Sequence, residues 1–172
     1  SITKIDQVEP HDPALIVYTS GTTGKPKGAV LSQKNLLAGA HSVRLAWQWK
    51  KNDRLLLCLP LFHMHGMGVG LHGTLLIGSS VVLQNGFQAE EVIQAIQEHQ
   101  VSMFFGVPTM YHRLAEHPRI QKLAKIRLCV SGSAPLAPSL HKRLNKEAGI
   151  QVLERYGMTE TVMLASNPYL GE

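Results

Sequence analysis

Short apolar runs recur along the chain and alternate with amphipathic stretches. Apolar runs that predict strands occupy residues 55–59, 80–84, 102–106, 127–131 and 151–155, and their starts are 25, 22, 25 and 24 residues apart. Each interval leaves room for a crossover helix and two loops. The pattern predicts an α/β fold with a mostly parallel sheet and helices on both faces. A further strand-like run, "ALIVYT", occupies residues 14–19.

Helix signals fill the intervals between these runs. Ser32 is a suitable N-cap for a helix with apolar residues at helical spacing. Residues 89–100 carry acids in their first turn, and Pro108 and Pro138 stand where a first helical turn would begin. Gly149 is expected to close the last helix at its C′ position.

Composition limits the class of protein. The 172 residues are 44% hydrophobic, which predicts a single α/β domain over residues 1–172. The net charge of +5 is spread over helices and loops rather than gathered in a block, so we expect no nucleic-acid partner.

The two cysteines and the apolar runs predict the cellular compartment of the protein and whether it crosses a membrane. Cys58 and Cys129 lie inside apolar runs, which favours buried free thiols and a reducing, cytoplasmic location. The weakly polar run 66–78 is too short to span a bilayer, and residues 1–13 are polar. We therefore expect a soluble protein with no transmembrane segment.

Glycine, hydroxyl and histidine residues cluster directly after the predicted strands. In an open α/β sheet, ligands bind at the carboxyl ends of the strands. We therefore expect the clusters that follow residues 19, 59, 106, 131 and 155 to meet at one edge and form one site.

The segment 18–28, "YTSGTTGKPKG", has a composition that suits an oligophosphate. Glycines let backbone N–H groups approach an anion, hydroxyls donate to its oxygens and lysines screen its charge. Its spacing differs from a Walker A sequence because Pro26, and no Ser or Thr, follows Lys25. This difference argues against a P-loop kinase or NTPase. A solvated glycine-rich loop without a ligand is the other interpretation.

Two further clusters suit a nucleotide. In "RYGMTE" (155–160), Tyr156 could stack on a base, Thr159 touch a phosphate and Glu160 hold Mg²⁺. Taken alone, the same residues suit a half-buried tyrosine and a solvated acid. In "SGSAPL" (131–136), small residues would let a flat ring approach the backbone, or they form a simple tight turn before the next helix.

A histidine pair in "PLFHMHG" (60–66) raises the possibility of a metal site. His63 and His65 are two residues apart and would point to opposite sides of an extended chain, and no third ligand is suitably spaced. A histidine that lines a pocket, or a structural histidine, is the favoured interpretation.

In this order, "YTSGTTGKPKGAVLS", "PLFHMHG", "SGSAPL" and "RYGMTE" strongly resemble the AMP-forming acyl-CoA synthetases of the adenylate-forming superfamily. The resemblance implies ATP, Mg²⁺ and coenzyme A as ligands, a small-molecule carboxylic acid as substrate, and the large N-terminal domain of such an enzyme as the fold. It implies that His63 lies beside the acyl pocket, Tyr156 stacks on adenine, Thr159 contacts the α-phosphate and Glu160 coordinates Mg²⁺. It further implies two binding segments, namely Ser133, Ala134 and Pro135 for adenine and Thr19, Ser20, Gly21, Thr22, Thr23, Gly24 and Lys25 for the β- and γ-phosphates.

Within that family, "LERYGMTET" followed by "SNPY" most resembles malonyl-CoA synthetases. Arg155 could form a bidentate pair with the distal carboxylate of a dicarboxylic acid. Alternatively, it pairs with Glu154 or another acid of the protein. Lys142 and Arg143 are weaker candidates for the same task.

Some functional parts of the family cannot be matched here. These are a carboxylate for the ribose, a hinge and a late catalytic lysine, because only twelve residues follow Glu160. We therefore expect the chain to be the central part of a larger enzyme, binding nucleotide weakly and inactive alone. Other activities stay open: a medium- or long-chain fatty acyl-CoA synthetase, another adenylating enzyme such as one that activates amino acids, or a non-catalytic nucleotide-binding module.

Overall fold

The computed structural model describes residues 6–19 and 24–170, and a six-stranded sheet forms its centre. Neighbouring strands pair in parallel, except that the last strand is antiparallel. The spatial order is β4 (Ser80–Leu83), β3 (Arg54–Leu57), β5 (Met103–Gly106), β6 (Leu128–Ser131), β7 (Val152–Tyr156) and β8 (Ala165–Ser166). The predicted α/β fold with a mostly parallel sheet is confirmed.

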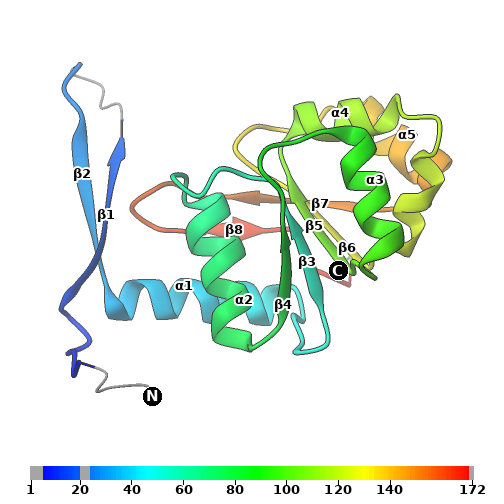
Figure 1. Cartoon of the computed structure of the whole chain (residues 1–172). Coiled ribbons are helices and arrows are strands. Elements are labelled where there is room, and N and C mark those ends of the chain that lie inside the picture. Colours follow the sequence, from blue (N-terminus) through cyan, green and yellow to red (C-terminus); the bar gives the residue numbers. More distant parts are fainter. Residues whose placement is uncertain (1–5, 20–23, 171–172) are drawn as a thin grey trace.

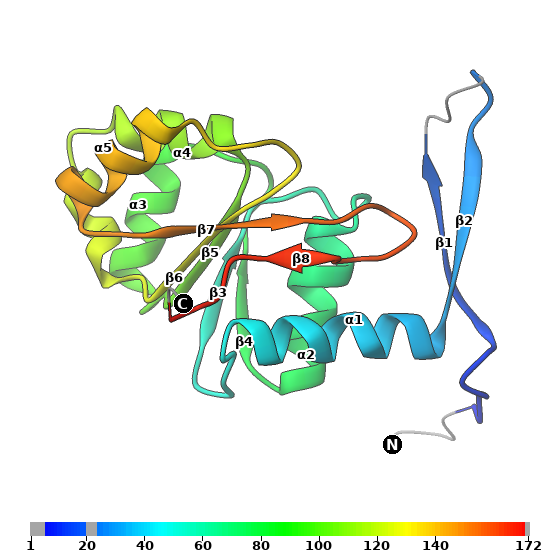
Figure 2. The ribbon, with the colours of Figure 1, turned by 180° about the vertical axis from the view of Figure 1, so that it is seen from behind.

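Helices cover both faces of this sheet (Figures 1 and 2). One face carries α1 (Gln33–Ala46), the π-helix η1 (His65–Leu71) and α2 (His72–Ile77). The opposite face carries α3 (Ala89–Glu98), α4 (Pro108–Ala115), the 3-10 helix η2 (Ile120–Lys125) and α5 (Pro138–Ala148). The prediction of helices on both faces is confirmed.

Alternate residues of the central strands feed two separate hydrophobic cores. Leu55 and Phe105 pack with the α1 side, whereas Leu56 and Phe104 pack with the α3 side. Successive side chains of a strand point to opposite faces, so an unbroken apolar run is required when both faces are covered. This requirement explains why the strands read as continuous apolar runs in the sequence.

The predicted helix ends are those observed. Ser32 caps α1: its Oγ accepts the Asn35 N–H at 3.2 Å, and the Asn35 side chain accepts the Ser32 N–H at 3.1 Å. Pro108 and Pro138 open α4 and α5. Gly149 ends α5 with a φ of 66°, in the left-handed region that glycine adopts at low cost.

The first strand lies outside the parallel sheet, which corrects the expectation that its loop shares the edge of that sheet. β1 (Pro13–Thr19) pairs antiparallel with β2 (Lys27–Ser32) in a separate hairpin that stands to one side of the sheet (Figure 1). Only seven residues join the two strands, too few for the crossover that a parallel connection needs. From Leu15 to Thr19 the strand also alternates partly buried and exposed positions, as expected for a hairpin.

The glycine-rich run that begins in the "PLFHMHG" segment is helical, as the strand spacing allows, although the residues themselves carry no clear helix signal. Residues 65–77 form η1 and α2, which pack on the same face of the sheet as α1, against Trp49 and Leu57. In the described part of the chain, no helix combines the length and the apolar character needed to cross a membrane.

Both cysteines are free and buried, as predicted. Burial raises the pKa of the Cys58 and Cys129 thiols to about 12. A thiol with so high a pKa has almost no thiolate at neutral pH, so neither side chain is a nucleophile.

A buried ion pair ties together the amino-terminal ends of the strands. Asp53 accepts hydrogen bonds from Arg127, from the Ser102 hydroxyl at 2.9 Å and from the Lys50 N–H at 2.7 Å. Arg127 also reaches the carbonyl of Trp47 at 3.3 Å. Burial raises the pKa of Asp53, but these donors outweigh it and hold the pKa below its usual range.

We predict that Asp53→Ala lowers the free energy of unfolding by about 2–3 kcal/mol, because it leaves the Arg127 guanidinium partly buried without its partner. Urea denaturation followed by circular dichroism measures the loss. Glu116→Gln is the control, since the His112–Glu116 pair is largely exposed and is worth less than about 0.5 kcal/mol. Equal losses in the two variants would contradict the prediction.

Candidate functional site

Two adjoining cavities lie at the carboxyl edge of the parallel strands. They have volumes of about 520 and 570 Å³, within the range of small-molecule sites. Ser133, Arg155 and Gly157 line both, so these residues form the boundary between the two. The convergence of the predicted loops is therefore confirmed for those that follow β3, β5, β6 and β7.

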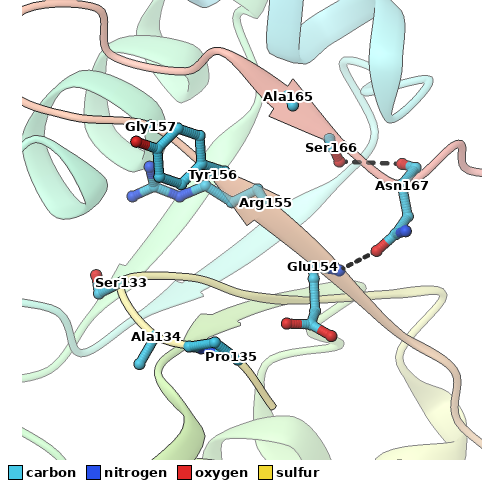
Figure 3. A pocket seen from close by; sticks show the side chains of 10 residues that line it. All are labelled: Ser133, Ala134, Pro135, Glu154, Arg155, Tyr156, Gly157, Ala165, Ser166 and Asn167. Carbon is cyan, nitrogen blue, oxygen red and sulfur yellow. Dashed lines mark hydrogen bonds between the residues drawn. The ribbon is translucent and has the colours of Figure 1, made fainter.

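The first cavity lies between the turn after β6 and the end of β7. Ser133, Ala134 and Pro135 face it from one side and Tyr156 from the other (Figure 3). Ser133 has a φ of 71°, which turns the chain sharply as it leaves the strand. Tyr156 is largely exposed, so its ring is open to a ligand. The predicted adenine-side residues are thus brought together.

Glu154 fastens that turn to the sheet. Its carboxylate accepts the Leu136 N–H at 3.0 Å and lies 3.0 Å from Nε2 of His141. Burial raises the pKa of Glu154, but the hydrogen bonds from Leu136 and His141 outweigh it and hold the pKa below its usual value. The carboxylate therefore stays ionised and keeps the turn in place at neutral pH.

The far wall of this cavity comes from the start of the "SNPY" run, to which the sequence analysis gives no role in a site. Asn167 accepts the Glu154 N–H at 2.8 Å, and its carbonyl accepts the Ser166 hydroxyl at 3.0 Å (Figure 3). Ser166 in turn accepts the Trp47 indole N–H at 2.8 Å. The sequence signal for this wall is the "SNP" run, because serine, asparagine and proline favour turns.

The second cavity is mostly apolar, with histidines at its rim. Met64, Val107 and Met110 supply apolar surface, while His63 and Thr159 bring polar atoms. His63 therefore lines the second cavity, and its place beside an acyl pocket stays a prediction.

Arg155 is buried between the two cavities and forms no ion pair with an acid of the described residues. It is 9% exposed, its Nε has no hydrogen-bond partner among the described residues, and Nη1 reaches only the Val162 carbonyl, at 3.4 Å. Glu154 is engaged by Leu136 and His141, so the interpretation of an Arg155–Glu154 pair is wrong. Burial lowers the pKa of Arg155 to about 10, which leaves the group charged at neutral pH and short of a counter-anion.

His65 is the functional-site residue that sequence reasoning underrates. It is 4% exposed, it stacks on Phe105 with ring centroids 6.2 Å apart, and both ring nitrogens lack partners among the described residues. Burial, with the charge of Arg155, lowers its pKa to about 3, so the ring is neutral. Gly132 makes this packing possible, because a Cβ there would lie 2.6 Å from Nε of Arg155 and 3.1 Å from the His65 ring.

The predicted phosphate segment is only partly described. Thr19 ends β1, and its hydroxyl is 3.5 Å from the Lys27 carbonyl. Gly24 has a φ of 80°, and Lys25 is exposed at the tip of the hairpin. Ser20, Gly21, Thr22 and Thr23 lie outside the described residues.

The expected magnesium ligand is a single exposed carboxylate. Glu160 follows Thr159 in the loop after β7, and no group of three His, Cys, Asp or Glu side chains suited to a metal occurs within residues 6–19 and 24–170. Mg²⁺ is commonly held by one or two carboxylates together with the phosphates of its substrate. Glu160 fits that arrangement, in which the ion would neutralise phosphate charge.

The geometry is that of an α/β protein with two adjoining cavities at the carboxyl edge of its parallel strands. The chain belongs to the family of AMP-binding enzymes, whose family model matches residues 2–172. The fold is that of the N-terminal domain of adenylate-forming enzymes.

Several individual members of this family are similar to the chain. The chain is 39% identical to the mitochondrial malonate–CoA ligase ACSF3 of Mus musculus over 90% of this chain and 29% of that protein. It is 41% identical to a sulfoacetate–CoA ligase of Cupriavidus necator over 93% of this chain and 32% of that protein. A solved malonyl-CoA ligase with methylmalonyl-CoA and AMP superposes with a TM-score of 0.93 at 45% identity, covering 98% of this chain and 38% of the ligase. The chain thus spans about a third of the length of these proteins.

We predict that His65 makes the protein less stable in acid. Because its folded pKa is about 3 and the unfolded value is 6.5, the unfolded chain takes up a proton first as the pH falls. Between about pH 6 and pH 4, His65 should contribute a loss of about 1.4 kcal/mol per pH unit to the free energy of unfolding.

Urea titrations at several pH values, on the protein and on His65→Gln, measure this contribution as a difference in slope. His63→Gln is the matched control, because His63 is exposed. A slope that is the same with and without the His65 imidazole would contradict the prediction.

Proposed function

We propose that the protein carrying this sequence activates a carboxylic acid with ATP and transfers the acyl group to coenzyme A. Support comes from the family of AMP-binding enzymes, from the two adjoining cavities, and from the solved malonyl-CoA ligase, which has methylmalonyl-CoA and AMP bound. In this proposal the adenosine occupies the first cavity and the acyl group the second.

We further propose that the acid carries a second anionic group, with malonate as the first candidate. The observation that carries this step is Arg155, a buried guanidinium at the boundary of the two cavities that has no acidic partner within residues 6–19 and 24–170. A distal carboxylate would supply two acceptors to the planar guanidinium and offset the cost of its burial. Malonate and sulfoacetate, the acids named for two relatives, share such a second anionic group.

The reaction needs charge placement more than proton transfer. A carboxylate is already ionised at neutral pH, so its attack on the α-phosphorus requires no general base. Thr159 would donate to the α-phosphate, Glu160 would hold Mg²⁺, and the segment from Thr19 to Lys25 would hold the departing pyrophosphate. Tyr156 and the turn from Ser133 to Pro135 would hold the adenine. The neutral His65 stacks behind this site and adds no charge that would repel Arg155.

A medium- or long-chain fatty acid is the second candidate. The apolar lining of the second cavity by Met64, Val107 and Met110 favours it. An alkyl chain, however, would leave Arg155 unpaired in a buried position, and that penalty ranks the fatty acid behind the dicarboxylate.

We predict that Arg155→Gly reduces kcat/KM for malonate at least about 30-fold, because the distal carboxylate loses its charged partner. The KM for ATP should change less than about threefold, since Tyr156 and the 133–135 turn are untouched. ATP–pyrophosphate exchange with malonate, sulfoacetate, acetate, octanoate and amino acids measures both effects in the protein that carries this sequence.

Lys142→Met is the matched control, because it removes an exposed positive charge from α5 and should leave the malonate rate unchanged. Undiminished malonate activation by Arg155→Gly would refute the dicarboxylate assignment. Absence of exchange with every acid in the unaltered protein would refute the ligase assignment itself.

A further inference from the structure

Val162 occupies a strained position in the loop that joins β7 to β8. Its φ of 62° lies in the left-handed region, which a β-branched residue rarely adopts. The side chain is 2% exposed, although its neighbour Leu164 is largely exposed. Such a conformation persists only where the surroundings impose it, so the contacts of Val162 identify what holds the loop.

Two glycines on different helices receive the side chain. An ideal Cβ on Gly39, in the middle of α1, would lie 3.1 Å from Cβ and Cγ1 of Val162 and 3.3 Å from Cγ2. An ideal Cβ on Gly68, in η1, would lie 3.4 Å from Cγ1. Glycine is unfavourable in a helix interior compared with alanine, so Gly39 has a packing reason to be there. Val162 is thus a wedge between α1 and η1.

The backbone of Val162 holds both ends of the same loop. Its N–H donates to the Met158 carbonyl at 3.0 Å, which closes a turn around Thr159 and Glu160. Its carbonyl accepts from Nη1 of Arg155 at 3.4 Å. Val162 therefore links two parts of the chain. One is α1, which follows the β1–β2 hairpin, and the other is the loop that carries Thr159 and Glu160.

We propose that Val162, seated against Gly39, is a positioning residue for Thr159 and Glu160 in the adenylation step. This inference rests on the proposed ligase function for its kinetic consequence, but its geometric consequence is independent of it. A side chain with stiff χ1 in a fixed notch leaves the turn little freedom, and pre-organised donors are what charge stabilisation requires.

A compensating pair of substitutions tests the wedge. Gly39→Ala adds a methyl group to the notch, whereas Val162→Ala removes two methyl groups from the wedge. We expect each single variant to raise the amide exchange rate of Val162 and Leu164 at least about tenfold and to lower kcat for ATP–pyrophosphate exchange at least about tenfold. The KM for ATP should stay within about threefold, because the adenine cavity is unchanged.

In the double variant Gly39→Ala/Val162→Ala, the added methyl group at position 39 takes the place of the two lost Cγ methyl groups. The one close approach that remains, 3.1 Å to Cβ of residue 162, needs a shift of only a few tenths of an ångström. The kcat and the amide exchange rates of this double variant should lie within about threefold of those of the unaltered protein. The effects of the two substitutions would then not add, whereas two independent destabilising effects would add. Leu45→Ala, at an exposed position of α1, is the control and should change neither.

Three outcomes overturn the inference: unchanged amide exchange in Gly39→Ala, a double variant no better than the single variants, or faster exchange with kcat intact. If the unaltered protein activates no acid, the proposed function fails while amide exchange still decides whether Val162 holds the loop.

Discussion

Burial of the parallel strands on both faces is the constraint on which the rest of the structure depends. β3, β5 and β6 have almost no exposed side chain, so most polar and charged side chains lie at the ends of these strands and in the loops that follow. At the amino-terminal ends the displaced polar groups are paired, as in Asp53 and Arg127. At the carboxyl ends, Nε of Arg155 and both ring nitrogens of His65 lack partners among the described residues, in contrast to the paired groups at the other end.

Arg127, which is partly buried, and Arg155, which is buried, show how the same side chain serves two purposes. Arg127 reaches a carboxylate, two backbone carbonyls and the face of Tyr169, 5.3 Å from its ring centroid, and so joins α1 to the segment after β8. Arg155 is also enclosed by its surroundings, but it donates one long hydrogen bond, to the Val162 carbonyl. A charge held in this way is destabilising while it lacks a counter-anion, and that cost is what the proposed distal carboxylate would offset.

The features that depend on a few neighbouring residues could be predicted from the sequence. The strand runs, the Ser32 cap, the helix-opening prolines and Gly149 each depend on a few neighbouring residues, and all were found where expected. The hairpin of β1 and β2 and the two-residue strand β8 depend on pairing between strands, which an apolar run does not specify. His65 was underrated for the same reason: its importance comes from Phe105, Gly132 and Arg155, which are distant in sequence.

The hydrogen bond from Trp47 to Ser166 has a spectroscopic consequence. The chain has two tryptophans, Trp47 and Trp49, and both are buried against Phe105 with ring centroids 5.2 and 5.5 Å away. The indole of Trp47 donates to a residue that lines the first cavity, so a ligand that shifts this wall also changes the polarity around a fluorophore. Intrinsic emission is therefore a built-in reporter of occupancy, read without a label and without turnover.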